Sequence, residues 1–103
     1  MPTAYITAPP ESAADLARLL VEERLAACVN VVACDSTYRW DGEVVEEPEG
    51  ILLAKTIDEG FDRLAARVVE AHPAEVPCVE RFDEADVLEA FGAWRAEAVE
   101  PVG

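Results

Sequence analysis

Basic residues are scarce in this sequence of 103 residues. Lysine and arginine together number 8, against 22 aspartates and glutamates, and the formal net charge is −14 at pH 7. A surface of that sign repels nucleic-acid phosphates and anionic lipid headgroups. No apolar run reaches the ~20 residues that a membrane helix needs, and the first four residues lack the pattern of a secretory signal. The sequence therefore argues against nucleic acid and membranes as partners and predicts a cytoplasmic protein.

Groups for covalent or phosphate chemistry are also few. There are two serines, one histidine (His72) and no Gly-x-Ser-x-Gly motif. A catalytic dyad of Cys28 with His72 has no local support, and a buried structural thiol is the favoured interpretation because free cysteine packs readily in cores. Pro9 and Pro10 remove two backbone donors from the first strand–helix turn, where a phosphate would bind. We therefore do not expect an enzyme.

The cysteines are three in number and form no Cys-x-x-Cys pair. This argues against a disulfide framework, an iron–sulfur cluster and a zinc knuckle, and it fits reduced thiols in the cytosol. Thiolate with imidazole suits copper and zinc, so metal binding is the chemistry that the residue types favour. Small apolar filler is the alternative for Cys34 and Cys78. The available ligands are Cys28, Cys34, Cys78, His72 and Glu75.

The imbalance of charge has a consequence for stability. Lys55 is the only lysine, and acidic residues crowd the polar faces. Their mutual repulsion lowers stability unless ions screen it, and the Debye length falls to about 3 Å at molar salt. The composition is typical of a protein from a salt-rich cytoplasm, with an ordinary acidic protein as the alternative.

Apolar periodicity and turn residues predict seven elements. In order they are a strand over residues 3–8, a helix over 12–24, a strand over 27–32 that resumes over 36–40, a strand over 43–45 that resumes over 51–56, a helix over 61–71, a strand over 76–82 and a helix over 87–98. The last helix is expected to bury a face made of Val87, Leu88, Phe91, Trp94 and Ala98.

Local signals predict how these elements begin and end. Ser12 and Asp86 are predicted to cap the first and last helices, and Thr56 with Glu59 forms a capping-box pattern before the middle one. Asp41-Gly42 predicts a tight hairpin turn, because both residue types tolerate positive φ. Pro48 cannot donate to a strand ladder, so we expect a break or bulge there. Pro73 and Pro101 are expected to end helices.

The predicted order is β-α-β-β-α-β-α, so residues 1–103 are expected to form one α+β domain. This is the ferredoxin-like βαββαβ sandwich with an extended β-hairpin and an added C-terminal helix. The long hairpin exposes strand edges, and proteins usually cover such edges by oligomerising.

Four motifs along nearly the whole chain then indicate a family. They are Glu-Arg-Leu-Ala-Ala-Cys-Val-Asn at 23–30, Tyr-Arg-Trp-Asp-Gly at 38–42, Lys-Thr at 55–56 and His-Pro-Ala-Glu-Val-Pro at 72–77, with residues 7–9 and Trp94 in matching places. In this order and spacing they resemble the CutA family of divalent-cation tolerance proteins. The resemblance implies a ferredoxin-like homotrimer, similar to PII-like signalling proteins, that associates with copper and other divalent cations.

The resemblance also implies roles for particular residues. Cys28, His72 and Glu75 match proposed metal ligands of the family. Tyr38, Trp40 and Lys55 match family positions that line a cleft between subunits. Arg39 is a further candidate for lining that cleft. The sequence departs from the family pattern at two positions. Ala74 stands where the family usually has tyrosine, and Cys78 where it usually has an acidic residue.

Other interpretations of these residues remain open. Arg39 and Lys55 could bind a small anionic ligand in a PII-like regulatory trimer. Arg24 and both of these residues could instead pair with glutamates inside a trimer, and Trp40 could anchor the interface. His72 could cap the second helix. A purely structural trimeric scaffold is the third alternative.

Overall fold

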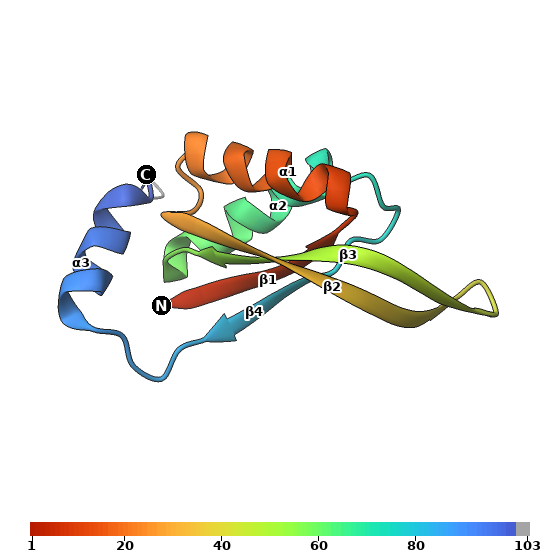
Figure 1. Cartoon of the computed structure of the whole chain (residues 1–103). Helices are drawn as coiled ribbons and strands as arrows, with labels where there is room; N and C mark the ends of the chain where they lie inside the picture. The colour runs from red at the N-terminus through yellow and green to blue at the C-terminus, as the bar shows by residue number, and fades with distance from the viewer. Residues whose placement is uncertain (101–103) are drawn as a thin grey trace.

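The backbone forms an antiparallel sheet of four strands in the spatial order β2-β3-β1-β4, with helices over one face (Figure 1). The structure is a computed structural model that describes residues 1–100. In chain order its elements are β1 (Pro2–Ala8), α1 (Pro10–Glu22), β2 (Cys28–Trp40), β3 (Glu43–Lys55), a 3₁₀ turn (Asp58–Gly60), α2 (Phe61–Ala71), β4 (Val79–Asp83) and α3 (Glu89–Ala98). The α+β, ferredoxin-like prediction with an added C-terminal helix is confirmed.

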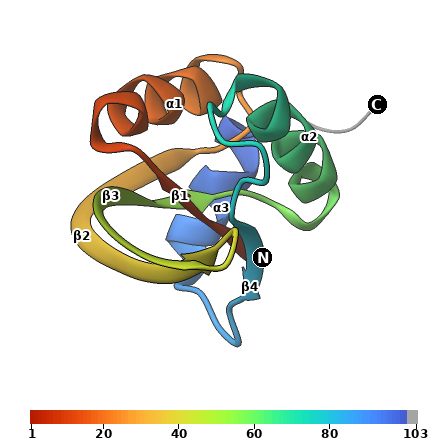
Figure 2. The same ribbon diagram turned by 90° about the vertical axis from the view of Figure 1, so that its right-hand side faces the viewer.

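The core lies between the sheet and the two helices α1 and α2, which lie on the same face (Figure 2). Because side chains alternate along a strand, Ala4, Ile6 and Ala8 of β1 face these helices and are fully buried. Leu20 and Leu64 pack against them from α1 and α2. Residues of the other parity, such as Tyr5 and Thr7, therefore point to the face that α1 and α2 leave uncovered.

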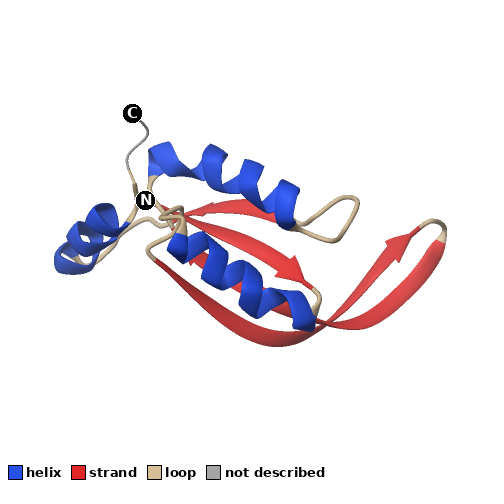
Figure 3. Ribbon diagram, turned by 90° about the horizontal axis from the view of Figure 1, so that it is seen from above, coloured by secondary structure: helices blue, strands red, loops and turns tan. Residues whose placement is uncertain are grey.

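The hairpin of β2 and β3 extends well past the rest of the sheet (Figure 3). Its pairing keeps one register from Cys28–Lys55 to Trp40–Glu43, and Asp41 and Gly42 turn the chain with φ of 51° and 80°. The predicted turn is confirmed. The pairing of β1 with β3 ends at Ala8–Gly50, so residues 43–49 of β3 pair with β2 alone.

The expected break at Pro48 is wrong. Pro48 pairs in register with Asp35, and β3 is continuous there. Pro48 lies past the end of β1, where one side of β3 has no neighbouring strand among residues 1–100. An edge of that kind tolerates a residue without an N–H group.

Two of the predicted helix starts are wrong because other groups satisfy the backbone. Ser12 lies inside the first turn of α1, and the N-cap is Pro9, whose carbonyl accepts the Ser12 N–H at 2.9 Å. Thr56 is buried and donates its hydroxyl to the carbonyl of Leu25 at 2.8 Å, so it does not form a box with Glu59. A 3₁₀ turn leads into α2 instead.

The last strand and helix also differ from their predicted bounds. β4 begins at Val79, three residues later than expected. Asp86 accepts the N–H of Val87, but α3 begins only at Glu89, so the predicted cap is wrong. Pro101 lies outside the described residues.

The predicted buried face of α3 is wrong as well. Leu88 is 78% exposed and Trp94 47%, whereas Arg95 is 1% exposed. The reason is position: α3 lies at the end of the sheet opposite the hairpin turn (Figure 1), away from α1 and α2. It is held there by Arg95 and by Val99, which packs with Ile57 in a small second cluster. No helix within residues 1–100 is long and apolar enough to cross a membrane.

Candidate functional site: an acidic and aromatic cavity

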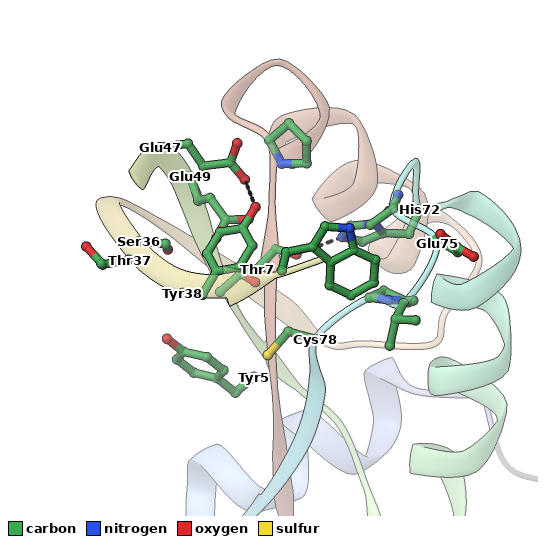
Figure 4. A pocket seen from close by; sticks show the side chains of 15 residues that line it. Tyr5, Thr7, Ser36, Thr37, Tyr38, Glu47, Glu49, His72, Glu75 and Cys78 are labelled. Carbon is green, nitrogen blue, oxygen red and sulfur yellow. Dashed lines mark hydrogen bonds between the residues drawn. The ribbon is translucent and has the colours of Figure 1, made fainter. Parts of the chain in front are cut away.

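A cavity of about 580 Å³ lies between the hairpin arm and the loop that precedes β4. Tyr38 and Trp40 of β2 line it, together with Glu47 and Glu49 of β3. The floor comes from β1, and the remaining wall is the segment of residues 72–78 (Figure 4). Residues from four separate parts of the chain therefore meet at one concave surface.

Register and alternation explain why these side chains meet. Tyr5 and Thr7 lie on the face of β1 that α1 and α2 do not cover. Val79 pairs with Ile6, so the preceding residue, Cys78, lies beside Thr7. Tyr38 lies on the hairpin, and its side chain is on the same face of the sheet as Tyr5 and Thr7. Figure 4 shows its ring above Tyr5 and Cys78. The cavity depends on contacts between segments that are distant in sequence.

The charge of the lining has one sign. Glu47, Glu49 and Glu75 all line the cavity, and no lysine or arginine does among residues 1–100. The Tyr38 hydroxyl donates a hydrogen bond to Glu47. That bond to the carboxylate raises the pKa of Tyr38 above its usual 10.0, because it stabilises the protonated phenol. The site therefore presents carboxylates and neutral phenols.

His72 is held by two hydrogen bonds at the end of α2. Its Nε2 donates to the carbonyl oxygen of Thr7 at 2.7 Å, and the Ala74 N–H donates to its Nδ1 at 3.0 Å. Both ring nitrogens are therefore engaged in this arrangement. His72 thus ties the loop before β4 to β1, and binding a metal would require it to give up one of these bonds.

Cys78 is half-buried and protonated. Burial raises the pKa of its thiol above the usual 9.0, a hydrogen bond from Thr7 opposes this, and the contact with Glu80 at 3.6 Å raises it further. Metal binding at Cys78 would therefore release a proton.

Cys28 and Lys55 lie at the opposite end of the hairpin from the cavity. They pair with each other in register, and Lys55 donates to Asn30 Oδ1 at 3.0 Å. Tyr38 is ten positions farther along β2 than Cys28, which corresponds to about 33 Å of strand. Arg39 is near the turn, where it donates to the carbonyl of Gly42, and it does not line the cavity.

Comparison with known proteins agrees with this fold and its motifs. The family model "CutA1 divalent ion tolerance protein" matches residues 3–98. The chain belongs to the CutA1 family. The divalent-cation tolerance protein CutA of Thermus thermophilus is 46% identical over 94 residues, which cover 89% of this chain and 91% of that relative.

Solved CutA structures share the whole fold. A structure described as the PII-like protein CutA from Nostoc, in apo form, has a TM-score of 0.94 and 35% identity, covering 97% of this chain and 98% of the other. A structure described as the periplasmic divalent cation tolerance protein CutA from Archaeoglobus fulgidus has a TM-score of 0.92 and 34% identity, covering 97% and 100%. The recognition made from the sequence motifs is confirmed.

The residues predicted from the CutA resemblance fall into two groups. Tyr38, Trp40, His72 and Glu75 line one cavity, whereas Cys28, Arg39 and Lys55 do not. Through Lys55, Cys28 lies level with Thr3 of β1, two strands away. His72 is bonded to Thr7, four positions farther along β1. Cys28 and His72 are therefore about 13 Å apart along the strand direction, in addition to the two-strand separation. Within residues 1–100 no three His, Cys, Asp or Glu side chains are grouped to hold a metal ion.

The sequence analysis missed Tyr5, Thr7, Glu47 and Glu49 as lining residues of this CutA cavity. The two-residue turn at 41–42 contained the needed signal, because it pairs Ser36 with Glu47. These carboxylates therefore share a face with Tyr38.

Proposed function

We propose that this CutA1 chain is a homotrimer that binds copper or another divalent cation, and that it is not an enzyme. The observation that carries the proposal is the charge of the cavity, which is lined by three carboxylates and one thiol and, among the described residues, by no lysine or arginine. A low-dielectric concave surface of one sign concentrates ions of the opposite sign. Cations are therefore favoured over anions.

The alternative, a small anionic ligand held by Arg39 and Lys55, would have to lie between copies of the chain. These residues are separated by about 36 Å of strand, because Lys55 pairs with Cys28 and Arg39 is eleven positions farther along β2. Within one chain they do not meet around one small molecule.

Assembly from several copies is part of the proposal. Within residues 1–100 no strand pairs with the outer edge of β2, which is 13 residues long. Val31 and Val32 on β2 are about half exposed, as is Phe82 on β4, the strand at the other edge of the sheet. Exposed apolar side chains beside a free strand edge are features that oligomers cover. A metal bound by Cys28 with His72 and Glu75 would then have to lie between copies, since one chain keeps them apart. Light scattering should give three times the chain mass of 11.2 kDa.

Copper titration tests the metal assignment. We expect Cys28→Ala to lower the stoichiometry or the affinity for Cu²⁺, because thiolate is a soft donor that copper prefers. Cys34→Ala, on the same strand, is the matched control and should leave binding unchanged. Cys78→Ala separates a site in the cavity from one at Cys28. Unchanged binding in both Cys28→Ala and Cys78→Ala, or binding lost equally in Cys34→Ala, contradicts the proposal.

Adaptation to salt is a second part of the proposal. A trimer would carry three times the formal charge of −14 on a small body, and the Debye length falls from ~30 Å at 0.01 M salt to ~3 Å at 1 M. We expect Tm to rise from millimolar to molar KCl. A flat or falling Tm would contradict the adaptation and leave the metal proposal standing.

The three free cysteines, none of them in a disulfide in the described chain, support a reducing compartment. We therefore propose a cytoplasmic location and a single CutA-like domain over residues 1–103. Localisation of the tagged protein by cell fractionation tests the compartment, and recovery in a periplasmic fraction would contradict it.

A further inference from the structure

The carboxylates of the cavity lie in two separate groups. Glu47 and Glu49 come from β3, and Figure 4 shows them on one side of the cavity, with Glu75 beside His72 on the other. The side chains of Glu49 and Glu75 make no hydrogen bond or ion pair within residues 1–100, and both ring nitrogens of His72 are already hydrogen-bonded. The negative charge on both sides is therefore available to a ligand.

Aromatic and apolar groups occupy the space between these two groups. Tyr38 and Trp40 line the cavity while remaining 39% and 49% exposed, so their rings are accessible. Val76 and Pro77 add apolar surface near Glu75. Aromatic rings attract ammonium groups through their quadrupole and also pack against methylene chains.

Within one chain this arrangement suits an elongated cation better than a metal ion, which would need a further ligand from another copy. The carboxylates are not grouped to hold one ion, since no cluster of three acidic, cysteine or histidine side chains with metal-binding spacing is found among the described residues. A ligand with positive groups at both ends can instead contact both sides at once. The volume of about 580 Å³ is within the ordinary range for small-molecule sites, about 300–1,000 Å³.

We propose that the cavity binds an aliphatic diamine or polyamine. One ammonium group is bound by Glu47 and Glu49, a second by Glu75, and the methylene chain packs against Tyr38 and Trp40. The inference rests on the proposed function in one respect, because both assign cations rather than anions to this cavity. It differs in the ligand, which is organic and needs no thiol or imidazole.

The first test compares amines that differ in their number of charges. The full-length protein in its native assembly is titrated calorimetrically with spermidine, 1,4-diaminobutane and 1-aminobutane in 0.15 M KCl, where the Debye length of about 8 Å screens diffuse attraction to the acidic surface. A hydrogen bond to a charged group is worth about tenfold in affinity or more. Spermidine and the diamine should therefore bind at least about tenfold more tightly than the monoamine.

The second test uses two variants and a matched control. Glu49→Gln and Glu75→Gln should each weaken spermidine binding about tenfold and should reduce the preference for diamine over monoamine, because only one end remains bound. Glu46→Gln is the control: it removes one negative charge from β3, but Glu46 does not line the cavity. The affinity of this variant for spermidine should stay within twofold of the wild-type value. Circular dichroism verifies that all three variants fold.

The outcomes separate this inference from the metal proposal. Equal affinity for diamine and monoamine, an equal effect of Glu46→Gln, or no amine binding overturns the inference, whatever copper does. Amine binding that meets both expectations supports the inference even if parallel copper titrations fail. In that case only the metal proposal falls.

Discussion

Replacing Arg95 by methionine removes a buried charge that joins three parts of the chain. The Arg95 side chain is 1% exposed. Its Nε donates to the Thr56 carbonyl at 2.6 Å, Nη1 donates to Glu84 Oε1 at 2.9 Å, and Nη2 donates to the Pro2 carbonyl. Arg95 thereby attaches α3 to the start of β1 and to the end of β3. Methionine fills a similar volume but satisfies none of these acceptors.

The expected loss of stability is large. Removing one partner of a buried ion pair costs about 3–5 kcal/mol. Here Arg95 is the buried partner, and its loss takes a donor from the carbonyls of Thr56 and Pro2. Glu84, whose side chain is 25% exposed, keeps the hydrogen bond from Thr3. A loss of this size is a substantial part of the ~5–15 kcal/mol that stabilises a typical domain. At about 4 °C or more per kcal/mol for a chain of this size, Tm should fall by roughly 15 °C.

Thermal unfolding followed by circular dichroism, at one protein concentration for all samples, measures this loss. Arg18→Met is the matched control, because Arg18 forms an (i, i+4) pair with Glu22 while its side chain is 81% exposed. A pair of that kind contributes at most about 1 kcal/mol. If Arg95→Met is no more destabilising than Arg18→Met, the buried pair does not hold α3 and the reasoning is refuted.

The pH dependence gives a second check on the same pair. Burial alone would raise the pKa of Glu84, but hydrogen bonds from Thr3 and Arg95 outweigh it and the pKa is lowered from its usual 4.5. A lowered pKa means that the stabilisation is complete above the unfolded-state value and is lost as the pH falls through the folded-state value. The stability difference between wild type and Arg95→Met should therefore shrink in acid. A constant difference from pH 6 to pH 3 would contradict this.

Two further predictions concern close packing and the cavity. A Cβ at Gly50 would lie 2.8 Å from the Cβ of Ala13, so Gly50→Ala should cost about 1–3 kcal/mol by urea unfolding. Gly92 lies inside α3, and a Cβ there would be 3.7 Å from the Cγ1 of Val87, an ordinary contact. Gly92→Ala should therefore be neutral or stabilising; equal losses would contradict the packing argument. Glu47→Ala should lower the pKa of Tyr38, whose hydrogen bond to Glu47 raises it, and an unchanged titration in alkaline absorbance spectra would show that this bond does not form in solution.

Much of the backbone could be predicted from local patterns. Alternation along residues 3–8, the helical period of α1 and α2, and the positive-φ residues Asp41 and Gly42 each depend on neighbours in sequence. The predicted helix caps were wrong because they do not depend on sequence neighbours alone. Thr56 has the right residue type and spacing for a cap, but its hydroxyl contacts Leu25, thirty-one residues away, and no local pattern contains that contact.

The candidate site divides in the same way. Residue types and motif order were enough to single out Tyr38, Trp40, His72 and Glu75, and all four line the cavity. Nothing local showed that Cys28 lies outside the cavity, because that depends on where β1 and residues 72–78 lie against the hairpin. Nothing local showed that both nitrogens of His72 are occupied by hydrogen bonds.

The sequence by itself thus determined the family, the order of the elements, the hairpin turn and the sign of the charge. These follow from residue identity, period and turn geometry, which act over a few residues. The tertiary structure decided that Arg95 rather than the apolar residues of α3 is buried. It also decided that Glu47 and Glu49 face Glu75 across one cavity. Both outcomes depend on which faces α1 and α2 already cover and on how far the hairpin extends past β1, and such contacts between distant segments are set only when the whole chain is packed.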